Sequence, residues 1–201
     1  MIPSAETVAL PAPRRDGAFA IERALAERRS VRNFGDAALT LAELSQLLWA
    51  AQGVADASGQ RTAPSAGAIY PLETYVVAGN VRDLATGIYR YEPRRHRLVR
   101  HAREDRRASL AAAAHGQDWT AAAPAMLVIA AVETRTTRKY GDRGARYVHM
   151  EAGHAAQNAL LQAAALGLGG TVVGAFDDAE VRRVLELRSG EQPLYLIPIG
   201  R

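Results

Sequence analysis

Arginine and serine side chains gather in one short segment, residues 28–32. The side chains that could bind a ligand there are Arg28, Arg29, Ser30 and Arg32. Guanidinium groups form planar, charge-assisted hydrogen bonds to phosphate, and a serine hydroxyl adds a further donor. Because the segment ends a predicted helix, the same cations could instead interact with the negative end of the helix dipole. Two interpretations therefore stay open, a phosphate-binding segment and a simple helix end.

Two further segments combine small residues with turn-forming residues. The first, residues 63–71, contains Pro64, Ser65, Ala66 and Gly67. Small side chains let a flat ligand approach the backbone closely, and the prolines stiffen the loop. An ordinary connecting loop has the same composition, so contact with a ligand is one of two interpretations.

The second of these segments, residues 167–176, includes Val172, Val173 and Gly174. It lacks the GxGxxG spacing and the lysine of a P-loop, and it follows a helix instead of opening one. These differences argue against a nucleoside triphosphatase. A backbone that presents N–H groups to a planar ring fits the segment better.

Lys139 and Tyr140 stand side by side in the sequence RKYGDRGARY. Both side chains can donate protons, and either can act as a general base when its pKa is shifted. The alternative is a surface loop with a charged face. The pair is the candidate for proton transfer in this chain.

Several kinds of catalytic centre are excluded by composition. The chain has 0 Cys, which excludes disulfides, cysteine nucleophiles and cysteine-ligated metal or iron–sulfur sites. His149 and His154 are five residues apart and so fall on different faces of a helix, with no carboxylate to complete a metal site. No GxSxG motif is present. We therefore expect no metal site.

The hydrophobic pattern predicts helices and strands in alternation. Thr40 and Glu43 form a capping box that opens a helix ending at Gly53. The apolar run from Ala125 to Val132 is typical of a strand buried on both faces. The longest helix is predicted from Arg146 to Leu166. Further strands are predicted at Thr74–Ala78, Gly87–Tyr91, Arg97–Arg100, Thr171–Phe176 and Leu194–Ile199, and further helices at Ile21–Arg29, Glu104–Ala114 and Asp178–Leu187.

The strands are joined partly by hairpins and partly by crossovers, which favours an α+β fold with a mixed sheet. Residues 1–20 are rich in Pro, Ala and small polar residues and are predicted to form an arm that is flexible or lies along a partner subunit. No domain boundary is evident after this arm. We therefore expect one domain over residues 21–201.

The charge and hydropathy of the chain bear on its partners. The net charge is +4 and the pI about 9.7, and the densest basic stretch, Arg90–Arg107, is interrupted by acidic residues and holds a single tyrosine for base stacking. We expect a solvated arginine-rich face there and no nucleic acid; steep salt-dependent binding would support the opposite. No apolar run reaches the roughly 20 residues of a membrane helix, and the start does not resemble a signal peptide. The expected location is the cytoplasm, with no membrane partner.

Six stretches, in this order, resemble the nitroreductase family of flavin enzymes, and more narrowly its SagB-type branch, which includes azoline dehydrogenases. They are RRSVRNF (28–34), APSAGAIYP (63–71), GIYRYEP (87–93), KYGDRGARYVHMEAGHAAQNALLQAAALGLGG (139–170), VGAFDD (173–178) and PLYLIPIGR (193–201). The resemblance implies a mainly antiparallel sheet flanked by helices, an interlocked homodimer, and FMN at the subunit interface. It covers the chain from about Ile21 to the C-terminus.

The resemblance also implies roles for individual residues. The basic segment 28–32 and Arg201 would hold the FMN phosphate and ribityl chain. Residues 64–67 would come from the other subunit and face the isoalloxazine. The turn formed by Val172, Val173 and Gly174 would lie beside the flavin N5 edge, where a backbone N–H can tune the cofactor.

The reaction that the resemblance implies is a ping-pong transfer of hydride through flavin. In the azoline branch a Lys-Tyr pair removes a proton while the flavin takes hydride, and Lys139-Tyr140 matches that pair. The expected activity is the dehydrogenation of a heterocycle or peptide-derived small molecule. Two alternatives are an NAD(P)H-dependent nitro or quinone reductase and a flavin-binding accessory protein without turnover.

Overall fold

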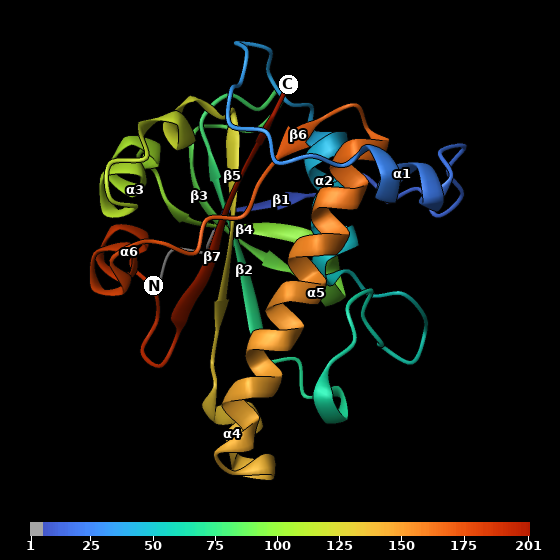
Figure 1. Ribbon diagram of the computed structural model, residues 1–201, viewed down its shortest axis with the longest axis vertical. Helices are drawn as coiled ribbons and strands as arrows, with labels where there is room; N and C mark the ends of the chain where they lie inside the picture. Colours follow the sequence, from blue (N-terminus) through green and yellow to red (C-terminus); the bar gives the residue numbers. More distant parts are fainter. Residues whose placement is uncertain (1–5) are drawn as a thin grey trace.

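One seven-stranded sheet forms the centre of the molecule, and helices cover both of its faces (Figure 1). The computed structural model describes residues 6–201. The strand order is β1-β4-β3-β2-β5-β7-β6. The strands are β1 (Thr7–Ala9), β2 (Leu72–Ala78), β3 (Gly87–Glu92), β4 (Arg97–Ala102), β5 (Ala125–Ala131), β6 (Gly169–Gly170) and β7 (Gln192–Gly200). The α-helices are α1 (Ile21–Glu27), α2 (Leu41–Gln52), α3 (Arg107–Ala113), α4 (Thr134–Tyr140), α5 (Arg143–Ala165) and α6 (Asp178–Leu185), and short 3-10 helices lie at Ala66–Ala68, Pro93–Arg95 and Asp118–Ala122.

Neighbouring strands of the sheet all pair antiparallel. This confirms the antiparallel sheet and corrects the expectation of a mixed one. Within residues 6–201, parallel pairing is confined to two isolated bridges, Ser30 with Gly170 and Leu39 with Val81. The reason is that β2, β3 and β4 follow one another as hairpins, while the helical crossovers return β5 and β7 in the opposite sense to their neighbours.

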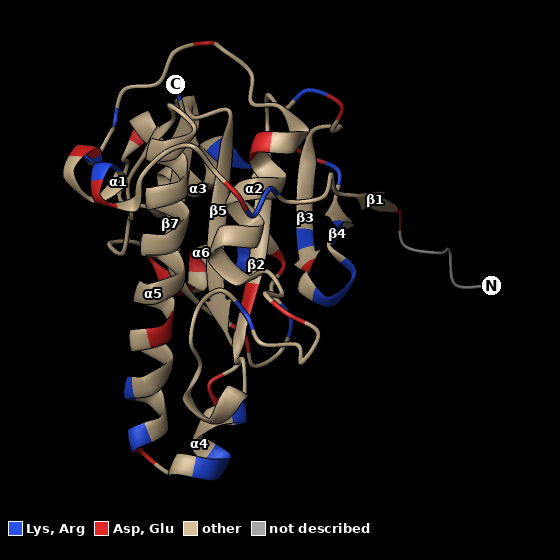
Figure 2. Cartoon of the chain, turned by 90° about the vertical axis from the view of Figure 1, so that its right-hand side faces the viewer, with Lys and Arg blue, Asp and Glu red and all other residues tan. Residues whose placement is uncertain are grey.

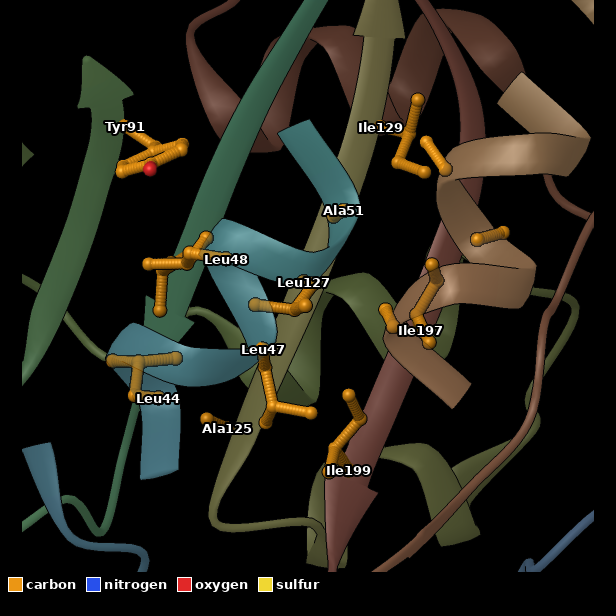
Figure 3. Close-up of a cluster of buried hydrophobic side chains, with 14 of the residues drawn as sticks. Leu44, Leu47, Leu48, Ala51, Tyr91, Ala125, Leu127, Ile129, Ile197 and Ile199 are labelled. Carbon is orange, nitrogen blue, oxygen red and sulfur yellow. The ribbon is translucent and has the colours of Figure 1, made fainter. Parts of the chain in front are cut away.

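Alternate side chains of the central strands build two separate cores. Val76 of β2 and Leu127 of β5 face the layer formed by α2 and α5, whereas Tyr75 and Val128 face the layer of α3 and α6. This alternation is the two-residue period of a strand with both faces covered. Figure 3 shows the first core, in which Leu44, Leu47 and Leu48 of α2 lie over the sheet beside Leu127 of β5 and Ile197 of β7.

Two predicted helices, α2 and α5, are confirmed, and the predicted capping box of α2 forms as well. Thr40 and Glu43 form both hydrogen bonds of the capping box at the start of α2, and the backbone N–H of Gly53 closes its end. The long helix α5 begins three residues before the predicted start and ends one residue before the predicted end. Its small residues Ala152, Ala155 and Ala159 are buried against the sheet, which places the helix axis close to the strands.

Two segments differ from the expectation. The predicted strand Thr171–Phe176 is wrong, because the strand β6 is Gly169–Gly170 and only Val173 bridges Leu196 beyond it. The helix α4 was not expected, since its sequence holds three threonines, which are poor helix formers. Packing against α5 and the glycine turn at Gly141 hold it in place.

The N-terminal stretch lies on this chain's own sheet as far as it is described. Thr7–Ala9 pairs antiparallel with Arg97–Val99 of β4, and Leu10 is buried. The Arg14 backbone exchanges hydrogen bonds with the Gln46 side chain of α2. Residues 1–5 of the predicted arm lie outside the described residues.

Candidate functional site

Lys139 and Tyr140 end α4 and lie against Gly67, although about seventy residues separate them in sequence. A Cβ atom on Gly67 would stand 2.7 Å from Tyr140 Oη and 2.8 Å from Lys139 Nζ. Gly67 has φ +62° and ψ +20°, a left-handed conformation that glycine adopts without steric cost. The Lys139 side chain is exposed and its Nζ lies 5.4 Å from the centre of the Tyr140 ring. The structure therefore brings together two of the sequence-predicted segments.

Tyr147 supports this pair from the first turns of α5. Its ring meets that of Tyr140 edge to face, with 5.2 Å between the centroids. Such aromatic contacts add a modest stabilisation beyond buried area. The contact with Tyr147 thus holds the Tyr140 hydroxyl next to Gly67.

Beneath the same loop lies a buried carboxyl group that sequence reasoning missed. Glu151 of α5 is 2% exposed, and its Oε1 has no hydrogen-bond partner among residues 6–201. Burial raises the pKa of Glu151 to about 7, while a hydrogen bond from the Ser65 hydroxyl and the positive charge of Arg61 act in the opposite direction. A signal was present in the sequence, because Glu151 is three residues after buried Val148 and so falls on the core face of the helix.

A polar network fixes the start of the loop. Arg61 donates to Gln52 Oε1 at 2.6 Å, and its guanidinium stacks 4.6 Å from the centre of the Tyr70 ring. The Tyr70 backbone N–H donates to Ser65 Oγ at 2.9 Å. Burial lowers the pKa of Arg61, and the charges of Glu73 and Glu151 oppose this. The loop is consequently held by side chains at several points along its length.

The basic segment 28–32 lies beside the glycines of β6. Ser30 bridges Gly170, and the Val31 N–H donates to the Gly170 carbonyl at 3.1 Å. A cavity of about 160 Å³ opens here, lined by Arg28, Arg29, Gly169, Gly170 and the end of α5. Two sequence-predicted segments are therefore adjacent at this second place.

Within residues 6–201, no carboxylate neutralises the arginines of this segment. None of Arg28, Arg29 and Arg32 forms an ion pair with a carboxylate in the described part of the chain. Arg29 instead donates to the carbonyls of Ala26 and Arg28, as the helix-end interpretation expects. Arg32 lies over the Trp119 ring, 5.8 Å from its centre.

Arg201 and the 172–174 turn have more specific partners than the sequence indicates. The Arg201 guanidinium is paired with Glu43 and donates to the Ala38 carbonyl, while its own carbonyl accepts from Gly35. Val173 is buried and exchanges both backbone hydrogen bonds with Leu196. Val172 and Gly174 on either side are exposed. A ligand at this turn would therefore meet the neighbours of Val173 before Val173 itself.

The two groups of candidate residues lie at opposite ends of α5 (Figure 1). Tyr140 packs on Tyr147, whereas the basic segment and its cavity adjoin Ala164. The rise of an α-helix makes these two places about 25 Å apart along the axis. Figure 2 shows Lys and Arg gathered at α4 and the first turns of α5, so the lower end is positively charged as well. One chain by itself does not join the two groups.

The remaining candidates outside these groups have structural explanations. In the stretch Arg90–Arg107, six of the eight arginines pair with carboxylates of this chain, including Glu73, Glu92 and Glu186. Residues 6–201 hold no cluster of metal-ligating side chains. No helix within the same range is long and apolar enough to cross a membrane.

Comparison with known proteins identifies the family. The model of the nitroreductase family matches residues 25–201. The protein MJ1384 of Methanocaldococcus jannaschii, which is named as a nitroreductase, is 52% identical over 181 residues, which is 90% of each chain.

Solved structures agree in fold. One from Ralstonia eutropha JMP134, titled a nitroreductase, has a TM-score of 0.86 at 32% identity and covers 97% of this chain and 89% of its own. One from Anabaena variabilis, titled likewise, has a TM-score of 0.86 at 30% identity, and this chain spans only 42% of its length. The E. coli microcin synthetase McbBCD complex with truncated pro-MccB17 has a TM-score of 0.74 at 25% identity, covering 99% of this chain and 79% of its own. The chain therefore belongs to the nitroreductase family of oxidoreductases.

Proposed function

We propose that this protein is an FMN-dependent oxidoreductase that dehydrogenates a heterocycle or a peptide-derived small molecule. The observation that carries the proposal is the position of Lys139 and Tyr140 against Gly67. Two proton-transferring groups thereby face a loop whose small residues leave room for a flat ring. The similarity to a microcin synthetase that holds a peptide supports a peptide-derived substrate.

The residues present fit a flavin mononucleotide. Arg28, Arg29 and Arg32, free of carboxylate partners within residues 6–201, would bind the phosphate with Ser30. The exposed backbone of Val172 and Gly174 would face the ring system, and Val173 would anchor that turn to β7. Arg201 would contribute to phosphate binding only after leaving Glu43. When bound, FMN would supply the acceptor for a hydride equivalent.

The chemistry assigned to this chain is proton removal. A carbon beside a heteroatom loses its proton to Tyr140 or Lys139 while the hydride leaves the adjacent atom of the substrate, so that a new double bond forms. Lys139 Nζ lies 5.4 Å from the centre of the Tyr140 ring, so either group is within reach of the same part of a bound substrate. Tyr147 and Gly67 hold the Tyr140 ring in place.

A complete site needs two copies of the chain in this proposal. The phosphate-binding segment and the Lys-Tyr pair are separated by most of α5. A twofold axis that pairs two such helices antiparallel would place the upper end of one chain against the lower end of the other. Large apolar side chains are exposed on the elements concerned, namely Ile21, Leu25, Met150 and Val172. A cavity of about 600 Å³ lined by Ile21, Phe19 and Trp49 adjoins α5 on the same side.

The first experiment is the visible absorption spectrum of the purified protein, followed by mass identification of any released cofactor. A flavin band with about one FMN per chain supports the proposal. A colourless protein that also fails to take up added FMN would contradict it.

A second candidate reaction is the reduction of nitroaromatics or quinones by NAD(P)H. It is favoured by the names of relatives, since MJ1384 is named as a nitroreductase and one similar structure from Clostridium acetobutylicum is titled an NADH oxidase. Stopped-flow mixing with NADPH separates the two reactions. Rapid bleaching of the flavin band supports the reductase, and no bleaching supports the dehydrogenase.

A further inference from the structure

Arg135 forms a partly buried ion pair that the proposed chemistry does not use. It lies on α4 one helical turn before Lys139, and its Nη2 atom is 2.7 Å from Glu73 Oε1 on β2. The Glu73 side chain is only 14% exposed, and its second carboxylate oxygen lies 3.4 Å from Nη1 of Arg90 on β3. Because Glu73 is largely withdrawn from water, this ion pair is screened less than one on an open surface. It therefore connects α4 to the sheet through charge.

The helix α4 depends on contacts of this kind to keep its place. It has seven residues, which is too short for an isolated helix, and three of them are threonines, which are poor helix formers. Packing of Tyr140 on Tyr147 holds its last residue. At its start, His149 Nε2 lies 3.4 Å from Glu133, so Arg135 provides the shorter and less exposed of these two contacts. Arg135 is therefore the stronger side-chain anchor of the first turn.

The same guanidinium lies beside the end of the loop that contains Gly67. Arg135 Nη1 is 3.5 Å from the carbonyl oxygen of Tyr70, three residues before Glu73. Tyr70 has φ +53°, a left-handed conformation that bulky side chains rarely adopt and that persists only where surrounding contacts enforce it. Lys139, one turn further along α4, lies against Gly67 within the loop. One side of α4 thus meets the loop at two points.

We propose that Arg135 is a positioning residue, which through its ion pair with Glu73 fixes the orientation of α4 so that Lys139 and Tyr140 meet the loop at Gly67. The proposal rests on the function proposed above, in which Lys139 and Tyr140 take a proton from the substrate. Arg135 itself does not take part in the proton transfer, since its guanidinium is paired with Glu73. A displacement of about 1 Å at a reacting group can cost about a hundredfold in rate. A small rotation of α4 is therefore enough to affect the reaction.

Hydrogen exchange read by mass spectrometry tests this anchor on the purified chain, with or without flavin. In Arg135→Gln, peptides that span residues 132–141 should exchange about threefold faster, because the ion pair no longer opposes opening of the helix. Since the Arg135 side chain is 42% exposed, its replacement should leave folding intact.

Arg138→Gln is the matched control for this variant. Arg138 is an exposed arginine of the same helix, and it forms no ion pair within residues 6–201. Its replacement should leave the exchange of α4 as in the wild type. Equal exchange in the wild type and Arg135→Gln, or the same increase in Arg138→Gln, overturns the proposal.

Steady-state kinetics tests whether the anchor acts on the reacting groups. With a thiazoline-containing peptide as substrate, Arg135→Gln should lower kcat by about tenfold or more and leave KM and the FMN content per chain as in the wild type. Arg138→Gln should retain the wild-type kcat. An unchanged kcat in Arg135→Gln, beside an active wild type, overturns the proposal.

Glu73→Gln tests whether Arg135 acts through Glu73. Each single replacement removes the same ion pair, so the double variant should have no lower kcat and no faster exchange than Glu73→Gln alone. Losses that multiply would show that Arg135 acts independently of Glu73, which overturns the proposal. A wild type without FMN or turnover would contradict the function proposed above, whereas the exchange of these variants would still decide the role of Arg135.

Discussion

The Tyr140 hydroxyl and the Lys139 amino group lie close together beside Gly67. Lys139 Nζ lies 5.4 Å from the centre of the Tyr140 ring, and a Cβ atom on Gly67 would stand 2.8 Å from Lys139 Nζ and 2.7 Å from Tyr140 Oη. A positioned acid or base contributes typically 10²–10⁴-fold to a rate. In the proposed reaction, proton transfer therefore depends on the side chains of Lys139 and Tyr140.

We expect Lys139→Ala and Tyr140→Phe to lower the rate of oxidation of a thiazoline-containing peptide by about a hundredfold or more, with FMN still bound. The matched control is Tyr147→Phe, which removes a hydroxyl from the neighbouring ring and keeps the aromatic contact. The measurements are kcat and the flavin content per chain. Unchanged turnover in both variants would remove the catalytic role of the pair.

Gly67 is the position where backbone and site are most closely connected. In Gly67→Ala the new Cβ would meet the ends of Lys139 and Tyr140, and the left-handed backbone costs about 1 kcal/mol. We expect kcat to fall by about a hundredfold because the two groups are displaced. Gly190→Ala shares the positive φ but has open space around it. A similar loss of kcat in both variants would show that the effect is one of backbone strain alone.

At the scale of elements, His96 connects the N-terminal stretch at Pro11 to α2 and β3 through hydrogen bonds. His96 Nε2 lies 3.0 Å from the Pro11 carbonyl and 2.7 Å from Ser45 Oγ, and Nδ1 lies 2.8 Å from the Tyr91 hydroxyl. Burial lowers the pKa of His96, and the hydrogen bond to Pro11 opposes this. The unfolded chain therefore binds the proton more readily than the folded chain does.

Consequently the free energy of unfolding should fall as the pH falls below about 6.5, the ordinary histidine pKa. In His96→Gln this part of the pH dependence should be lost. Urea unfolding of both proteins between pH 8 and pH 5 gives the comparison, and exposed His115→Gln is the control. If the free energy of unfolding of the wild type and of His96→Gln changed with pH in parallel, His96 would bind protons equally well in the folded and the unfolded chain, against this prediction.

The elements differ in how far local sequence determined them. The capping box of Thr40 and Glu43 and the apolar run of β5 carry their own signals, and both elements form where they were expected. The helix α4 has weak local signals and depends on its contact with α5. The meeting of Gly67 with Tyr140 could not be predicted from periodicity, because it depends on how a loop and a helix distant in sequence pack. Arg201 pairs with Glu43, a contact that no local pattern indicates, and its expected role at a phosphate stays a prediction.

The whole molecule presents exposed apolar side chains around α1 and α5. Leu25 is 57% exposed and Met150 is 53% exposed. If two chains pair through this side, a charge placed there must be desolvated without a partner. We expect Leu25→Asp to shift the protein from dimer to monomer in sedimentation velocity and to weaken FMN binding tenfold or more.

Ser109→Asp is the control for this variant, because it adds the same charge on α3, which covers the opposite face of the sheet. It should leave both sedimentation and FMN binding as in the wild type. A wild-type chain that sediments as a monomer while binding FMN normally would contradict the dimer.

The distance along α5 between the basic segment and the Lys-Tyr pair has a genetic consequence. If each site takes its phosphate-binding arginines from one chain and its Lys-Tyr pair from the other, two different inactive variants can restore one another. Coexpressed Arg28→Ala and Lys139→Ala chains would form mixed dimers in which one site carries both lesions and the other carries neither. Random pairing makes half of the dimers mixed, so about a quarter of the wild-type activity should return. A site contained within one chain would show no such recovery.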